Sequence, residues 1–202
     1  MSPVFDPTTD GADQTYRLLT AMVVPRPIAF ISSMSSEGEL NLAPFSFYNV
    51  ACPWPPILST SIGRRNRDHD RKDTWRNIQE TGEYVVNLVS DEIAEQMNTT
   101  SGEYAADVNE FQVAGLTPIS SRRVKAPSVA EARVRAECVL ERIVEFDGGS
   151  HALVLGQIVS ISVADEVWVN GRVDLRALKP VGRLSGNLYC RTHDMFSMVR
   201  PD

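Results

Sequence analysis

The chain has 202 residues, of which 43% are hydrophobic and 23% are charged, and its formal net charge at pH 7 is −6. A chain of this length and composition can bury a sizeable core, so we expect one domain over residues 1–202. The negative charge argues against a general nucleic-acid binder, because such a protein needs many Lys and Arg side chains facing the phosphates.

The N-terminal part of the chain has neither the pattern of a secretory signal nor that of a membrane anchor. Residues 1–14 are polar and acidic, and no apolar run reaches the roughly 18 residues that a transmembrane helix needs. Apolar residues then recur at helical spacing over 14–22 and predict a short helix, which Pro25 and Pro27 would end. We therefore expect a cytoplasmic protein without a membrane partner.

A β-hairpin is predicted next. The β-branched and aromatic residues over 28–33 indicate a strand, and the turn sequence SSEG at 35–38 folds it back on the segment 38–53. Pro44 lies in the middle of this segment and cannot donate a hydrogen bond to a neighbouring strand. The backbone at Pro44 is therefore expected to lie at a sheet edge or at a bulge.

The middle of the chain alternates short strands and short helices. Strands are predicted over 57–62 and 84–89, and helices over 74–80 and 91–97. A charged loop over 64–73 precedes the first of these helices.

Two long strands are predicted in the C-terminal half. Apolar and polar residues largely alternate over 133–140 and over 151–163, and Gly148 and Gly149 between them provide a tight reversal. Strands outnumber helices and are joined by apparent hairpins, which disfavours a doubly wound parallel sheet. We predict a mainly β fold with peripheral helices, built as an antiparallel barrel.

The sequence carries none of the common signatures of a metal site or a covalent catalyst. Neither G-x-G-x-x-G nor a Walker motif is present, so a Rossmann site is not expected. The three cysteines are far apart and match no C-x-x-C pattern, which favours free thiols in a reducing cytosol: Cys52, Cys138 and Cys190.

The charged loop is a candidate anion site, because it holds five of the 20 basic residues: Arg64, Arg65, Arg67, Arg71 and Lys72. Directly after it, Asp73 or Thr74 can cap a helix whose first N–H groups would lie beside Lys72. Phosphate suits such a helix start. The alternative is a solvated loop whose basic residues pair with Asp68, Asp70 and Asp73.

Small residues along the segment with Pro44 suggest a second part of the same site. Asn41, Ala43 and Ser46 would let a flat ring approach a kinked strand and its free N–H groups, although they also suit an ordinary hairpin. Together with a phosphate site, a flat phosphorylated cofactor is the better explanation.

Nine motifs occur in an order that resembles the flavin reductase-like family with an FMN-binding split barrel, over about residues 20–190. They are PRPIAFISS (25–33), NLAPFSFYNV (41–50), KDTWRNI (72–78), GEYVVNLV (82–89), NEF (109–111), GL (115–116), EC (137–138), LVLGQIV (153–159) and RLSGNLY (183–189). The resemblance implies a six-stranded antiparallel Greek-key barrel, a homodimer, and FMN bound near the subunit interface.

The resemblance also implies which residues contact the flavin. Ser33 would lie near its phosphate or ribityl chain, the backbone of 41–43 beside its ring, and Ser46 in contact with the ring. The full set of implied cofactor-binding residues is Ser33, Asn41, Leu42, Ala43, Ser46, Ser59, Thr60, Ser61, Arg65, Lys72, Asp73 and Thr74.

One departure from the family pattern concerns the nicotinamide side. Many members carry Gly-Asp-His before the second long strand, whereas this chain has Gly149, Ser150 and His151. The serine removes a carboxylate that could orient the imidazole. His151 is thus either a residue at the nicotinamide or a packed interface histidine.

The function that the resemblance implies is an NAD(P)H-dependent flavin reductase using FMN, with NADH or NADPH as electron donor and a flavin-dependent monooxygenase as one conceivable partner. In such an enzyme the cofactor carries the chemistry, so no triad is needed. Two alternatives stay open. One is an FMN-containing electron carrier or a reductase of another small molecule, and the other is a non-catalytic flavin-binding module.

Overall fold

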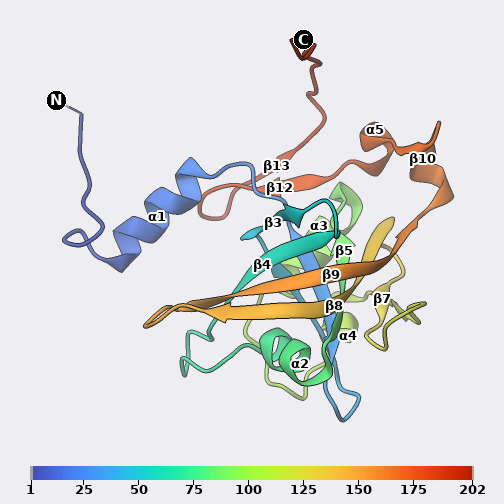
Figure 1. The fold of residues 1–202 in the computed structure, drawn as a ribbon, viewed down its shortest axis with the longest axis horizontal. Helices are drawn as coiled ribbons and strands as arrows, with labels where there is room; N and C mark the ends of the chain where they lie inside the picture. The colour runs from blue at the N-terminus through green and yellow to red at the C-terminus, as the bar shows by residue number, and fades with distance from the viewer. Residues whose placement is uncertain (1, 202) are drawn as a thin grey trace.

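The main feature of the fold is a seven-stranded sheet in which every pairing is antiparallel (Figure 1). The structure is a computed structural model that describes residues 2–201. In hydrogen-bonded order the strands are β2 (Leu40–Phe45), β1 (Ala29–Met34), β5 (Glu83–Leu88), β8 (Val134–Glu145), β9 (His151–Val163), β4 (Ile57–Gly63) and β3 (Tyr48–Cys52).

The sheet curls into a split barrel because its two outer strands are consecutive in the chain. Only Ser46 and Phe47 separate β2 from β3, and two residues span at most about 7 Å, so the two edges of the sheet must approach each other. The Ser61 N–H donates to the Phe47 carbonyl oxygen (2.8 Å) and ties the connection to β4. The mainly β class is thus confirmed, with seven strands instead of six because the segment around Pro44 forms two strands.

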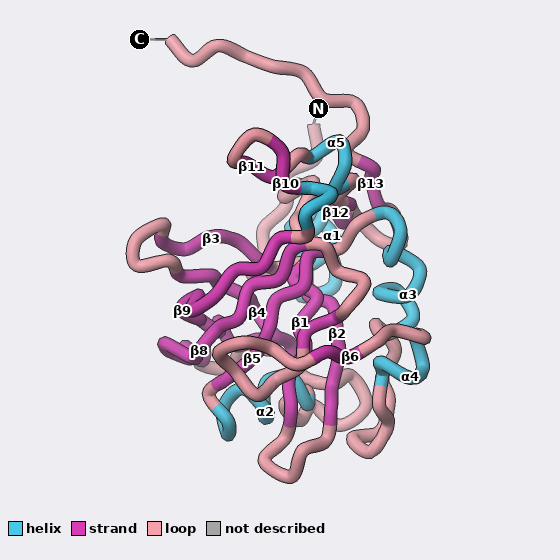
Figure 2. The backbone as a smooth tube through the Cα atoms, turned by 90° about the vertical axis from the view of Figure 1, so that its right-hand side faces the viewer, coloured by secondary structure: helices cyan, strands magenta, loops and turns pink. Residues whose placement is uncertain are grey.

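Short helices and strand pairs surround this sheet (Figure 2). The helical segments are α1 (Ala12–Met22), α2 (Asp73–Thr81), η1 (Asp91–Ile93), α3 (Ala94–Thr99), α4 (Glu110–Ala114), η2 (Asp165–Val167) and α5 (Leu175–Leu178). The short pairs are β6 (Pro118–Ile119) with β7 (Ser128–Val129), β10 (Trp168–Val169) with β11 (Arg172–Val173), and β12 (Val181–Arg183) with β13 (Tyr189–Arg191). The helices and strands predicted from periodicity are confirmed to within a few residues, and β8 runs five residues beyond its predicted end at Leu140.

Pro44 lies on an edge strand, as its missing N–H predicts. It pairs with Phe30 of β1 on one side, and β2 has no neighbouring strand on the other. An edge position costs no ladder hydrogen bond, so the proline is tolerated there.

Two buried clusters hold the helices against the sheet. Trp75 and Ile78 of α2 pack with Tyr84 inside the barrel, while Phe111 of α4 packs with Leu42 in a second cluster. These contacts place the start of α2 and the start of α4 next to the same edge strand.

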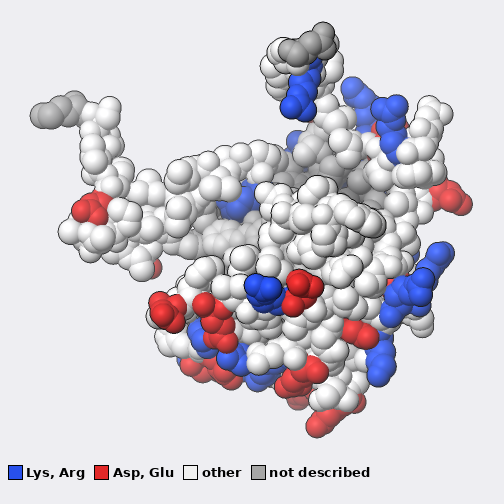
Figure 3. Space-filling model, viewed as in Figure 1, with Lys and Arg blue, Asp and Glu red and all other residues white. Residues whose placement is uncertain are grey.

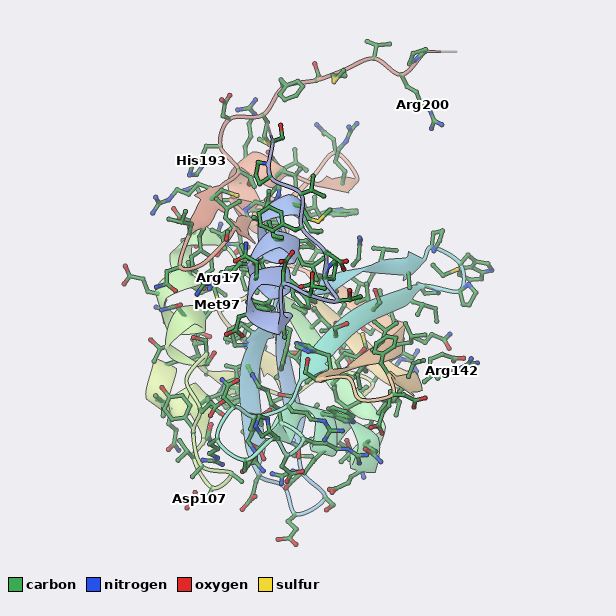
Figure 4. All side chains as sticks on the ribbon, turned by 90° about the vertical axis from the view of Figure 1, so that its left-hand side faces the viewer. Arg17, Met97, Asp107, Arg142, His193 and Arg200 are labelled. Atoms are coloured by element: carbon green, nitrogen blue, oxygen red, sulfur yellow. The ribbon has the colours of Figure 1, made fainter. Side chains whose placement is uncertain are left out.

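The two ends of the chain project from the barrel. The N-terminal residues with α1 and the C-terminal segment both extend away from the barrel (Figure 1). The C-terminal segment can be followed in Figure 4 from His193 to Arg200. Within residues 2–201, no helix has both the length and the apolar character that crossing a bilayer requires.

Candidate functional site

A cleft lies along the free side of β2. Its narrow end is bounded by β2, the start of α2 and residues 100–104, and its wide part by α1, α3 and the pair β12–β13. The two parts share Pro44, Phe45, Lys72 and Ser101. Of the sequence-predicted site residues, those that line the cleft are Asn41, Ala43, Ser46, Arg65, Lys72, Asp73 and Thr74.

The arginines of the charged loop form ion pairs within the protein, as the alternative interpretation of that loop supposed. Arg64 and Arg71 both pair with Glu145 of β8, at 3.5 and 2.9 Å. Arg65 lies within 3.3 Å of Asp68 and 3.1 Å of Asp70. Figure 3 accordingly shows basic and acidic side chains intermixed around α2, and not a patch of one sign.

Lys72 differs from these arginines because it has no ion pair with any residue among 2–201. Its Nζ lies 5.9 Å from the centre of the Phe45 ring, and both residues line the cleft. A cation without an ion pair where the two parts of the cleft meet is available to an anionic ligand.

The first turn of α2 has no side-chain cap. Lys72 itself is the N-cap residue, with extended backbone angles (φ −62°, ψ 152°), so the prediction that Asp73 or Thr74 caps this helix is wrong. The Asp73 carboxylate instead pairs with Arg76 and, at 3.8 Å, with Arg65. The N–H groups of this helix start are therefore free of side-chain caps beside Lys72, which favours anion binding.

A buried polar network connects the start of α2 to β2. The Asn41 Oδ1 accepts hydrogen bonds from Thr74 Oγ1 (2.6 Å) and from Ser33 Oγ (3.2 Å). Asn77 in turn donates to Ser33 Oγ at 3.2 Å. Ser33 is fully buried behind Asn41, so it supports the cleft without lining it.

Glu110 completes this network and was not a predicted site residue. Its Oε1 accepts from Asn41 Nδ2 (2.9 Å) and its Oε2 from the Leu42 N–H (3.1 Å). The Leu42 side chain lies in the second core cluster, so neither its side chain nor its N–H is free for a ligand. In the sequence, Glu110 stands out only as part of the motif NEF, which does not indicate its role.

The three consecutive hydroxyl residues of β4 do not line the cleft. Thr60 alternates with Leu58 and Ile62, both of which are in the barrel cluster, so its side chain faces inward. Ser59 and Ser61 therefore face outward, and Ser59 Oγ donates to the Asn49 carbonyl oxygen (3.2 Å). A contact between these residues and a cofactor stays a prediction.

His151 lies beside the turn between β2 and β3. Its ring stacks on Phe47 with centroids 5.6 Å apart, and its Nδ1 is hydrogen-bonded to Ser150 Oγ (2.8 Å). Ser46, the residue before Phe47, accepts a hydrogen bond from Arg26 Nε (3.3 Å). The imidazole is thus oriented by a hydroxyl, which is weaker than a carboxylate at stabilising its charged form.

The environment of His151 predicts a pH dependence of stability. Burial lowers its pKa and the positive charge of Lys72 lowers it further, whereas the unfolded chain has an ordinary value of about 6.5. The unfolded state therefore binds the proton more readily. The contribution of His151 to the free energy of unfolding is thus complete above about pH 7 and decreases as the pH falls through about 6.5. In urea titrations, lowering the pH from above about 7 to below about 6.5 should decrease the free energy of unfolding less in His151→Gln than in the wild type. Identical decreases would contradict a lowered pKa.

Comparisons with known proteins agree with this fold. The flavin reductase like domain family matches residues 21–175. Nitrilotriacetate monooxygenase component B from Bacillus cereus is 35% identical, with a TM-score of 0.93 over 98% of this chain and 99% of that one. The 2-nitrobenzoate 2-nitroreductase of Pseudomonas fluorescens is 32% identical, with a TM-score of 0.88 over 98% and 96%.

An uncharacterized protein of Halalkalibacterium halodurans is 42% identical over 97% of this chain and 95% of its own length. The family match covers most of the chain and the structural similarity extends along nearly all of it. The protein therefore belongs to the flavin reductase-like family of split-barrel oxidoreductases.

Proposed function

We propose that the protein is an NAD(P)H-dependent flavin reductase that binds FMN in the cleft along β2. The observation that carries this proposal is Lys72, a cation without an ion pair within residues 2–201, next to the uncapped start of α2. A phosphate monoester fits this pair of features, because it takes both a lysine and the N–H groups of a helix start.

The remaining cleft residues suit the flat part of the cofactor. Small side chains line the cleft at Ala43 of β2 and at Ser46 just after it, and Pro44 between them has no N–H. A ring can therefore lie close to the backbone there. FMN would supply the hydride-accepting ring atoms, while the protein binds and orients it. His151, next to the β2–β3 turn, would lie on the nicotinamide side with a neutral imidazole.

A homodimer and a partner oxygenase are further parts of the proposal. Apolar side chains of Leu19, Met22 and Trp54 are exposed by 48%, 73% and 86%, which suits a covered surface. The similarity to a component B of a monooxygenase supports delivery of reduced flavin to a second protein. The similarity to a nitroreductase supports reduction of another small molecule as the second candidate function.

An anaerobic titration tests the proposal. Protein loaded with FMN should lose the absorbance of its oxidised flavin when NADH or NADPH is added in equimolar amount, because two electrons pass from each nicotinamide to each flavin. The measurement is the absorbance after each addition, with dithionite reduction as the control for reducible flavin.

The outcomes separate the candidates. Loss of absorbance with either nucleotide supports the reductase, and faster reoxidation by a nitroaromatic than by oxygen would favour the second candidate. Bound FMN that only dithionite reduces would contradict the NAD(P)H-dependent activity and favour an electron carrier or a binding module. Failure to take up FMN would contradict all of them.

A further inference from the structure

Glu110 is a buried carboxylate whose role the proposed FMN site does not yet explain. Only 7% of its surface is exposed, and it forms no ion pair with any of residues 2–201. It begins α4, which Asn109 caps by accepting a hydrogen bond from the Phe111 N–H (3.0 Å). An unpaired buried charge is costly, so the hydrogen bonds that Glu110 accepts, among them the two from Asn41 and Leu42, must hold it there.

These two hydrogen bonds fix the edge strand at the narrow end of the cleft. The Leu42 N–H is directed away from β1 and donates to Glu110, and Pro44 two residues later has no N–H. Asn41 is held on both sides, by Glu110 at its amide nitrogen and by Thr74 at its amide oxygen. Glu110 therefore connects β2 to the start of α2 through one side chain.

Glu110 also contributes charge to this end of the cleft. The charged and titratable groups that line the narrow end with it are Arg65, Lys72, Asp73, Glu103 and Tyr104. Arg65 and Asp73 are engaged in ion pairs, and Glu103 accepts a hydrogen bond from the Asn66 N–H (2.7 Å). Lys72, Glu103 and Glu110 are thus the three groups at this end whose charges have no ion-pair partner, within the part of the chain that the structure describes, and of the two carboxylates Glu110 is buried whereas Glu103 is exposed.

We propose that Glu110 is a positioning residue of the FMN phosphate site, which holds Asn41 and β2 against the start of α2 and makes phosphate binding depend on its own protonation. This inference rests on the proposed function. A phosphate anion beside Lys72 would repel the carboxylate, so binding favours the protonated form of Glu110. Proton uptake by Glu110 then accompanies FMN binding.

The surroundings of Glu110 raise its pKa above the ordinary value of a glutamate. Burial raises its pKa, the hydrogen bonds from its own backbone and from Leu42 and Asn41 act in the opposite direction, and the negative charge of Asp73 raises it again. An anion at the start of α2 would raise the pKa of Glu110 further. FMN should therefore bind more tightly as the pH falls through the pKa of Glu110.

The phosphate group of FMN titrates too, with a second pKa of about 6, and loses charge in the same direction of pH. The variant Glu110→Gln separates the two effects, because it removes the charge of residue 110 and keeps a side chain of similar size that can still form both hydrogen bonds. Its amide can accept from the Leu42 N–H and donate to a rotated Asn41 amide, whose nitrogen then donates to the Thr74 and Ser33 hydroxyls. Glu110→Ala removes both the charge and the acceptors.

The experiment measures the Kd of FMN by fluorescence quenching for the wild type and both variants at two pH values, a lower one towards the ordinary glutamate pKa of about 4.3 and a higher one above neutrality. At the higher pH, Glu110→Gln should bind FMN about fivefold or more tightly than the wild type, and this ratio should shrink at the lower pH. For riboflavin, which lacks the phosphate, the ratio of the wild-type Kd to the Glu110→Gln Kd should not change with pH.

The role of Glu110 in holding β2 in place can be tested without flavin. Hydrogen exchange at the Leu42 amide should be slow in the wild type and in Glu110→Gln, and faster in Glu110→Ala because the acceptor is gone. Glu110→Ala should also bind FMN more weakly than Glu110→Gln at both pH values. Equal exchange rates in all three proteins would overturn the positioning role.

Other outcomes overturn different parts of the argument. If both the wild type and Glu110→Gln bind FMN and the Kd of FMN changes with pH in the same way in both, the coupling to protonation is overturned and the proposed function stays intact. A wild type that binds neither FMN nor riboflavin would overturn the proposed function, and with it the role of Glu110 in phosphate binding.

Discussion

Replacing Lys72 with alanine is expected to weaken FMN binding by roughly 10- to 150-fold. A hydrogen bond to a charged group contributes about 1.5–3 kcal/mol, which corresponds to this range of Kd. Lys72 forms no ion pair with residues 2–201, so its removal leaves no carboxylate of the protein unpaired and should leave the fold intact. The measurement is the Kd of FMN for folded protein, with folding checked by circular dichroism.

Two controls make this result specific. Arg67→Ala removes a cation from the same loop that is paired with Asp68 at 3.5 Å and does not line the cleft, so FMN affinity should change little. Riboflavin should lose little affinity in Lys72→Ala, because it has no phosphate. Equal losses for FMN and riboflavin would place Lys72 near the ring and contradict its assignment to the phosphate.

Replacing Gly156 with alanine is expected to destabilise the protein by about 3 kcal/mol or more, at the upper end of the usual cost of overpacking. Gly156 lies in β9, and a Cβ atom there would be 1.9 Å from Tyr84 Oη and 2.6 Å from Tyr84 Cζ. Tyr84 is fully buried in the barrel cluster, so its ring cannot move aside without displacing neighbours. Thermal unfolding should show a Tm lower by roughly 6–12 °C.

A second substitution identifies the cause. Tyr84 Oη is buried and has no hydrogen-bond partner among residues 2–201, so Tyr84→Phe by itself should cost little stability. In Gly156→Ala it removes the closest contact and should restore part of the lost stability. Strictly additive effects of the two substitutions would show that the clash with Tyr84 is not the reason for the loss.

Local sequence patterns predicted the class of the fold because they report strand periodicity and turn chemistry. The alternation over 151–163 predicted the bounds of β9, and Gly148-Gly149 predicted the reversal before it. The missing N–H of Pro44 predicted an edge strand, since a proline costs nothing there. The division of residues 38–53 into β2 and β3 was missed, because closure of the sheet decides where that segment bends.

Local patterns were thus enough to predict an antiparallel β protein with a cluster of basic residues before α2 and an edge strand at Pro44. Which cation of the cluster stays unpaired depends on long-range contacts, because Arg64 and Arg71 meet Glu145, which lies 81 and 74 positions later in the chain. Only the tertiary structure brought Asn41 to Thr74 and to Glu110, which are 33 and 69 positions away. Such contacts depend on how strands and helices pack, and no local pattern of residues records that packing.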